Sequence, residues 1–416
     1  MICKNKEVAI VLAGTNPHVE LISKLKKRNF YVLLFDQADN PPGKEICDEY
    51  FQISFLEKEK ILKIAHERQA KLVISAAAER AHAVACYISE ARNQYVPYSY
   101  VTAIRISNKV SLKSSMIEFQ LPTSNFLIIN NYNEFDNNNK LCFPLVVKPS
   151  DGYGSRGIHV YHNKKDLKQG LKSNISLNNS TPVIIEEYLE GREFGVYCFL
   201  DQIKANIIFI NEKIKAHNLD ELPAFGTISN PDLEPGTIKI FNNIANSIMQ
   251  YFSLKNTPLL IQLIKTNEGI KILEFTPRLG GGVSYKTVKI QTGFDFIEAS
   301  IDSFMGIQHK QNYKNHNFQV TDSGIYAKPG IFSKIIGYDR LIKEGIIEDI
   351  VLYKNLGMPV GHDFSSSSRV GAFIIKSYSK EELYEKIDQA YKTIDVYDIE
   401  GKSILLRDFH INKNCY

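Results

Sequence analysis

The chain has few cysteines, and their arrangement matches neither a metal site nor a disulfide framework. Six cysteines are spread over 416 residues without a Cys-x-x-Cys pair. This wide spacing argues against a zinc site and against a set of disulfides, and it favours a reducing compartment. The cysteines are at positions 3, 47, 86, 142, 198 and 415.

Long apolar runs and a large excess of one charge are also missing. The apolar segment 8–13 is too short for a signal peptide, and no run approaches the about 18 apolar residues of a membrane span. The net charge of +4 gives no general attraction to nucleic acid, and the one basic segment, 24–28, is typical of a solvated helix end. We expect a cytoplasmic protein with no nucleic-acid or membrane partner.

The first 105 residues alternate strand-like and helix-like patterns. This alternation predicts parallel βαβ units with a site at the carboxyl ends of the strands. Only Gly14 follows the first strand, so dinucleotide binding is not expected there, and Asp36 is assigned a structural or substrate-side role. The expected strands are 8–13, 31–36 and 72–75, and the expected helices are 17–27, 58–68 and 77–91.

Beyond residue 105 the pattern changes to strand pairs with scattered helices. A chain of 416 residues is long enough for two or three domains. We predict an α/β domain at 1–105, a central α+β domain at 106–325 whose smaller part covers about 106–187, and a C-terminal domain at 326–416. In the last part, strands are expected near 349–353 and 370–377, and an amphipathic helix at 380–393.

The most informative stretch is 144–157, Pro-Leu-Val-Val-Lys-Pro-Ser-Asp-Gly-Tyr-Gly-Ser-Arg-Gly. Its glycines allow backbone N–H groups to surround a phosphate. A dinucleotide fingerprint needs a helix next, but the alternating run 158–161 predicts a strand. The loop therefore joins two strands as a flap over a nucleotide would, although an ordinary turn also uses glycine. The candidate phosphate-binding residues are Lys148, Gly152, Gly154, Ser155 and Gly157.

A second motif is the hairpin expected at 259–278. A three-residue loop would pair Thr266 with Ile270 and set Gln262 across from Glu274. Cross-strand neighbours lie about 4.5–5.5 Å apart at Cβ, close enough to share a cation, and Thr276 lies on the same face. Mg²⁺ takes oxygen ligands, commonly one or two protein groups plus substrate phosphates. The alternative is a hairpin face that meets only water.

The hairpin continues into Thr-Pro-Arg-Leu-Gly-Gly-Gly, residues 276–282. The glycines let the backbone approach a ligand closely. Arg278 carries a planar fork suited to a carboxylate or a phosphate, while a surface ion pair is the alternative use of an arginine here.

The order of the glycine-rich loop and the acidic hairpin, about a hundred residues apart, resembles the ATP-grasp enzymes. Within that superfamily the chain is similar to the L-amino acid ligases, which make dipeptides, and to biotin carboxylase. The resemblance covers nearly the whole chain. It implies an ATP-grasp fold between an N-terminal pre-ATP-grasp Rossmann-like domain and a C-terminal ligase-type domain. It also implies ATP and Mg²⁺ (or Mn²⁺) as cofactors and a small-molecule carboxylate and amine as partners, and it allows a homodimer.

The resemblance implies roles for single residues. Lys109 and Lys148 would meet ATP phosphates, and Glu193 matches an acid near the ribose. The run 186–189 resembles the hinge where a carboxylate and backbone groups recognise adenine. The nucleotide set thus adds Glu186, Glu187, Tyr188 and Leu189.

On the catalytic side, Gln262 and Glu274 match two metal-ligand positions, and Arg278 matches the arginine that stabilises the phosphoryl group or the substrate carboxylate. The usual Glu-x-Asn-Pro-Arg is here Glu-Phe-Thr-Pro-Arg, so Thr276 is a shorter oxygen donor. Weaker substrate-side candidates are Glu79, His217, Gly281, Gly282 and Arg369.

These observations predict an ATP-dependent carboxylate–amine ligase that forms an amide or peptide bond through an acylphosphate and releases ADP and phosphate. The carboxylate is expected to be an amino acid or a specialised-pathway acid. The alternatives are a bicarbonate-using carboxylase or carbamoyl-phosphate-like synthetase, and an inactive ATP-binding partner. The chain has no biotin-carrier motif and no duplicated half, which counts against the bicarbonate enzymes.

Overall fold

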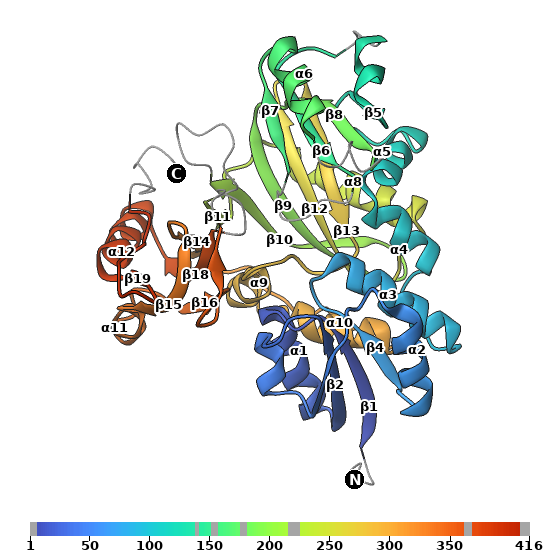
Figure 1. Cartoon of the computed structure of the whole chain (residues 1–416), viewed down its shortest axis with the longest axis vertical. Helices are drawn as coiled ribbons and strands as arrows, with labels where there is room; N and C mark the ends of the chain where they lie inside the picture. The colour runs from blue at the N-terminus through green and yellow to red at the C-terminus, as the bar shows by residue number, and fades with distance from the viewer. Residues whose placement is uncertain are drawn as a thin grey trace.

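The computed structural model describes residues 6–137, 141–150, 157–174, 181–214, 225–361 and 368–407. Its N-terminal part is a four-stranded sheet of order β3-β2-β1-β4 in which every pairing is parallel (Figure 1). The predicted βαβ pattern is confirmed, and the structure adds the short strand β3. The elements are β1 (Glu7–Leu12), α1 (Asn16–Lys27), β2 (Phe30–Asp36), β3 (Glu49–Gln52), α2 (Lys58–Glu67), β4 (Leu72–Ile74) and α3 (Glu79–Ala91).

A smaller layer follows, built on an antiparallel sheet of order β5-β8-β6-β7. Its inner face packs on helix α6 through a small core around Leu145, Leu167 and Ile185. Its elements are α4 (Tyr100–Ser107), α5 (Lys109–Glu118), β5 (Phe126–Ile129), β6 (Leu145–Pro149), β7 (His159–Tyr161), α6 (Lys164–Lys172) and β8 (Val183–Glu187).

An eight-stranded antiparallel sheet of order β13-β12-β9-β10-β11-β14-β18-β16 forms the centre of the molecule. It joins strands from both sides of position 325, and the predicted domain limits stay a prediction. The central elements are β9 (Arg192–Leu200), β10 (Ala205–Ile214), β11 (Gly226–Ser229), α8 (Thr237–Tyr251), β12 (Thr257–Thr266), β13 (Gly269–Thr276), α9 (Ser284–Thr292), α10 (Phe296–Phe304) and β14 (Gln319–Tyr326).

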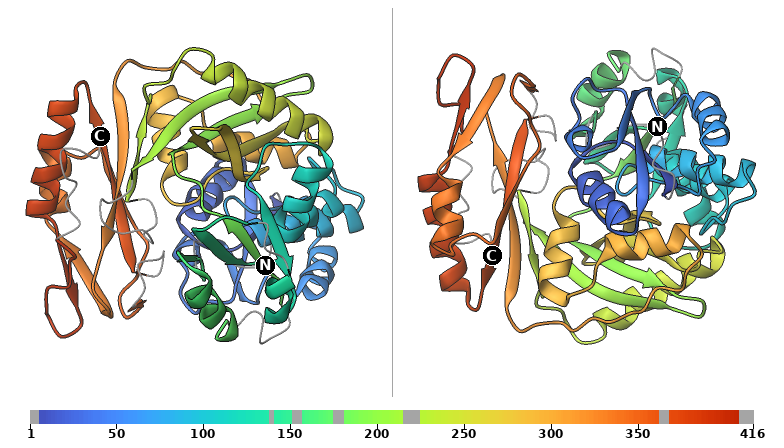
Figure 2. Two further views of the ribbon diagram at one scale, coloured as in Figure 1. Left: turned by 90° about the horizontal axis from the view of Figure 1, so that it is seen from above. Right: turned by 90° about the horizontal axis from the view of Figure 1, so that it is seen from below.

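The C-terminal elements form one flank of the molecule (Figure 2). A three-stranded sheet, β17-β15-β19, stands beside the end of the long sheet. None of the described helices is long and apolar enough to cross a membrane. The elements are β15 (Gly330–Ile336), α11 (Tyr338–Lys343), β16 (Asp349–Leu352), β17 (Pro359–Val360), β18 (Arg369–Ser377), α12 (Lys380–Thr393) and β19 (Asp395–Asp398).

The β12–β13 hairpin corrects one expectation. Thr266 pairs with Gly269, not with Ile270, because the turn holds two residues instead of three. A bulge between Gln262 and Leu263 then shifts the register by one residue, as an extra residue in one strand does. Gln262 therefore still lies opposite Glu274, as predicted, although the pairing assumed near the turn was wrong.

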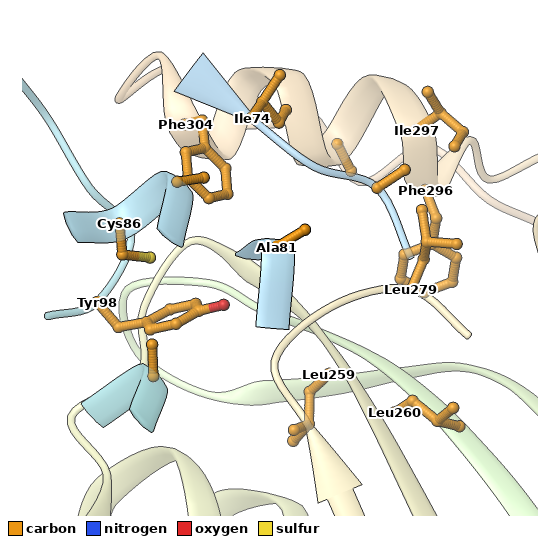
Figure 3. Packing of buried hydrophobic residues seen from close by; sticks show 14 of the residues in the cluster. Ile74, Ala81, Cys86, Tyr98, Leu259, Leu260, Leu279, Phe296, Ile297 and Phe304 are labelled. Carbon is orange, nitrogen blue, oxygen red and sulfur yellow. The ribbon is translucent and has the colours of Figure 1, made fainter. Parts of the chain in front are cut away.

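One continuous core fixes the N-terminal sheet to the central sheet. Figure 3 shows Ile74 and Ala81 of the first part close to Phe296, Ile297 and Phe304 of α10. Ion pairs between α1 and the α10 segment strengthen the same contact: Lys24 lies 2.9 Å from Asp295, and Arg28 lies 2.7 Å from Asp302. This packing holds the start of α3 against the end of β13, where predicted site residues lie.

Candidate active site

Three adjoining pockets lie between the small sheet, the central sheet and the start of α3, and Gln262 lines all three. The first, about 220 Å³, has apolar walls from Val146, Ile158, Ile264 and Leu273. We call it the nucleotide pocket. The predicted nucleotide residues that line it are Lys148, Glu186, Glu187, Tyr188, Leu189 and Glu193.

Glu186 lies at the back of the nucleotide pocket between two lysines. Its carboxylate contacts the ammonium of Lys148 from β6 and lies 2.7 Å from that of Lys113 from α5. Burial by itself raises the pKa of Glu186, but the two lysines lower it to about 2. The carboxylate thus takes part in an ion cluster, and the recognition of adenine by the run 186–189 stays a prediction. In the hinge backbone, the N–H groups of Glu187 and Tyr188 already donate to the Asn125 and Pro144 carbonyls.

The second pocket, about 100 Å³, gathers Glu79, Lys109, Thr276 and Arg278. We call it the phosphoryl pocket. Lys109 begins helix α5, whose first turn is capped by Asn108 through the Ser111 N–H. A helix start and a lysine together favour anionic groups.

Arg278 is partly committed within the phosphoryl pocket. One terminal nitrogen donates to the Leu279 carbonyl at 2.8 Å, and the other lies 3.7 Å from Glu79. Its buried Nε has no hydrogen-bond partner in the structure. Burial raises the pKa of Glu79, and Arg278 and a hydrogen bond from Thr276 oppose that rise. An orphaned guanidinium N–H beside a carboxylate is the arrangement expected where an anionic substrate group binds.

The predicted metal ligands meet one residue that the sequence did not indicate. Gln262 donates from its amide nitrogen to Glu274, and its oxygen accepts from Lys213 at 2.6 Å. Lys213 also lies 3.1 Å from Glu193. Within the described ranges no group of three or more His, Cys, Asp or Glu could hold a metal by itself. One carboxylate and one amide oxygen still suit Mg²⁺ that keeps waters and substrate phosphates as its other ligands.

The third pocket, about 260 Å³, lies beyond Gln262 and Gly281. We call it the acceptor pocket. Arg369 at the start of β18 and Asp322 on β14 both line it, which brings the weak candidate Arg369 into the site and adds Asp322. Burial raises the pKa of Asp322, opposed by a hydrogen bond from Thr227 and the charge of Arg369. The remaining polar lining includes Tyr197, Asn211, Thr227, Ser284 and Tyr353.

The glycines that follow Arg278 keep the acceptor pocket open. A Cβ at position 280 would lie 2.7 Å from the Ser284 hydroxyl, and Gly282 adopts a left-handed φ of +64° beneath Tyr353. Gly157, after the flap, also has a positive φ, +72°. Four predicted residues lie outside the described ranges: Gly152, Gly154, Ser155 and His217.

A larger hollow of about 700 Å³ lies between β10 and α8, and none of the predicted site residues lines it. Its lining has one charged side chain, Lys204, so it lacks the charges that a phosphate or an acylation site requires.

Comparison with known proteins finds a domain match and structures of similar fold. Residues 141–286 match the family model described as "ATP-grasp domain". A phosphoribosylamine–glycine ligase from Caldanaerobacter subterraneus subsp. tengcongensis is 23% identical over 71% of this chain and 73% of its own. The L-amino acid ligase structure from Bacillus licheniformis superposes with a TM-score of 0.79 at 19% identity, over 95% of this chain and 99% of that one. Biotin carboxylase from Campylobacter jejuni gives 0.71 at 16% identity, over 97% and 94%.

The chain thus matches the ATP-grasp domain model over residues 141–286 and has the fold of the L-amino acid ligase and biotin carboxylase structures. The resemblance drawn from the sequence motifs, including its link to the L-amino acid ligases and to biotin carboxylase, is confirmed.

Proposed function

We propose that the protein joins a small carboxylic acid to an amine at the cost of ATP, through an acylphosphate, with ADP and phosphate as products. The observation that carries the proposal is the meeting of the three pockets at Gln262. A nucleotide in the first would point its phosphates toward Lys109 and Arg278, and the acceptor pocket opens on the other side of the same residues.

The chemistry asks these side chains for position and charge. Lys148 and Lys109 neutralise the phosphates, and Arg278 holds the substrate carboxylate near the γ-phosphate with its unpaired Nε–H. The carboxylate oxygen attacks the γ-phosphorus and ADP leaves; the amine nitrogen then attacks the acyl carbon and phosphate leaves. Mg²⁺, held by Glu274 and Gln262, would supply further positive charge to the phosphoryl group.

The acceptor pocket supports an amino acid as one substrate. Arg369 suits a carboxylate, and Asp322 suits an ammonium group, so a zwitterion would meet opposite charges within one pocket. A bicarbonate enzyme would need no such pair of opposite charges, and it is therefore the second candidate.

A phosphate-release screen with ATP and paired carboxylic acids and amines tests the proposal. We expect turnover only with both substrates, an amide product by mass spectrometry, and ADP as the nucleotide product. AMP and pyrophosphate in equal amounts would refute the acylphosphate route. Turnover with bicarbonate in place of the acid would favour the second candidate, and ATP binding without turnover across the panel would favour an inactive partner.

A further inference from the structure

Lys113 is a buried lysine to which neither the motifs nor the proposed reaction assigns a role. Its side chain is 6% exposed, and the nucleotide pocket is lined by its neighbours Glu186 and Lys148 but not by Lys113 itself. A buried lysine is rare unless paired, so its partners indicate its purpose.

All three ammonium hydrogens of Lys113 have protein acceptors. The nitrogen lies 2.7 Å from the Thr123 hydroxyl, 2.9 Å from the Ser124 hydroxyl and 2.7 Å from Glu186 Oε2. Ser124 in turn donates to the same carboxylate oxygen. Lys113 is therefore saturated and has no donor to offer a ligand.

Lys148 contacts the other oxygen of Glu186 and differs from Lys113 in its surroundings. Its side chain is 20% exposed and lines the nucleotide pocket. Lys113, Lys148 and Glu186 together carry a net charge of +1, presented on the side of Lys148, where the charges of Glu274 and Glu193 also act. With Glu186 alone, Lys148 would form a neutral pair and attract phosphates less.

We propose that Lys113 is a positioning residue for nucleotide binding: it neutralises and holds Glu186, so that Glu186 does not cancel the positive charge that Lys148 directs at the phosphates. The inference rests on the proposed ATP site. Charge pairing overcomes burial in the lowered pKa of Glu186 and the raised pKa of Lys148, whereas burial prevails at Lys113 and lowers its pKa despite Glu186.

Calorimetric binding of ATP and of adenosine to the full chain tests this proposal. Lys113→Met should weaken ATP binding about tenfold to hundredfold, the size of one charge-assisted interaction. Adenosine binding should change little, because only the phosphates sense the missing charge. Lys63→Met, at a side chain 78% exposed on α2, is the matched control with the same change in net charge, and it should bind both ligands as the wild type does.

The double variant Lys113→Met/Glu186→Gln restores a net charge of +1 and should recover ATP affinity. It also removes the buried carboxylate, whose loss of one of its two lysines could prevent Lys113→Met from folding. If the single variant does fail to fold, the comparison becomes Glu186→Gln with and without Lys113→Met, and the addition should leave ATP affinity nearly unchanged, because Lys113 then has no carboxylate to neutralise.

Three outcomes would overturn the proposal: Lys113→Met binds ATP as the wild type does, its ATP and adenosine affinities fall in parallel, or the double variant is not rescued. In the Glu186→Gln background, a large further fall in ATP affinity on adding Lys113→Met would overturn it too. Failure of the wild type to bind ATP would instead refute the proposed function, so the two failures are distinguishable.

Discussion

The nucleotide pocket and the acceptor pocket differ in how their charged side chains are arranged. In the nucleotide pocket, Glu186 is enclosed by Lys113 and Lys148, and apolar side chains form the walls. In the acceptor pocket, Asp322 and Arg369 face the same hollow among hydroxyl and amide groups. A base needs apolar walls and phosphates need a fixed positive charge. The acceptor pocket instead presents charged side chains of both signs, and we therefore expect this pocket to select the substrate.

The largest expected effect on turnover lies between the nucleotide pocket and the acceptor pocket. Glu274→Ala should lower kcat about a thousandfold, since it removes the charged ligand of the catalytic metal. Steady-state rates over a magnesium titration measure it, with Glu234→Ala as the control because that side chain is 73% exposed in a surface ion pair. Near wild-type rates at ordinary magnesium would show that the metal assignment is wrong. Gln262→Ala should cost less, because its oxygen is neutral.

The comparison between the two pockets predicts that substitutions in the acceptor pocket change the KM of a substrate without changing ATP binding. Arg369→Met should raise KM for one substrate about a hundredfold, the size of a lost charge-assisted pair, while ATP binding stays unchanged. Asp322→Asn should act in the same direction with the shape preserved. Measured ATP dissociation constants that rise together with substrate KM would break the distinction between the two pockets.

A third prediction concerns the region around Arg278. The buried histidines His18 and His82 have pKa values lowered to about 3 by burial, with Arg278 adding to the effect. Below pH 6.5 the unfolded chain takes up protons that the folded chain does not, so stability falls as the pH decreases toward 3. By pH 5 the loss is about 2 kcal/mol per histidine. Urea unfolding at pH 7.5 and pH 5 measures it. An unchanged pH dependence in His82→Gln would contradict the assignment.

The smallest effect is expected at Thr276, where the sequence departs from the ATP-grasp pattern. Its hydroxyl contacts Glu79, so Thr276→Val should change turnover only a few-fold, by about the value of one neutral hydrogen bond. The half-saturating magnesium concentration should stay the same. A large rise in that concentration would make Thr276 a metal ligand.

Much of the nucleotide pocket could be predicted because its signals are local. The strand with Lys148, the hinge at 186–189 and the pairing of Gln262 with Glu274 follow from short patterns and from the alternation of strand faces. The register near the turn could not be predicted, because the same sequence is compatible with a two-residue loop and with a three-residue loop. The bulge compensates for the one-residue difference in register between them.

The sequence by itself determined the order of strands and helices and the resemblance to the ATP-grasp enzymes, since these depend on periodicity, turn chemistry and motif spacing. Only the tertiary structure decided that Lys113 contacts Glu186, that Lys213 contacts Gln262, and that Asp322 shares a pocket with Arg369. These partners come from separate strands and helices. Their meeting depends on how the sheets pack, and no local pattern in the chain encodes that packing.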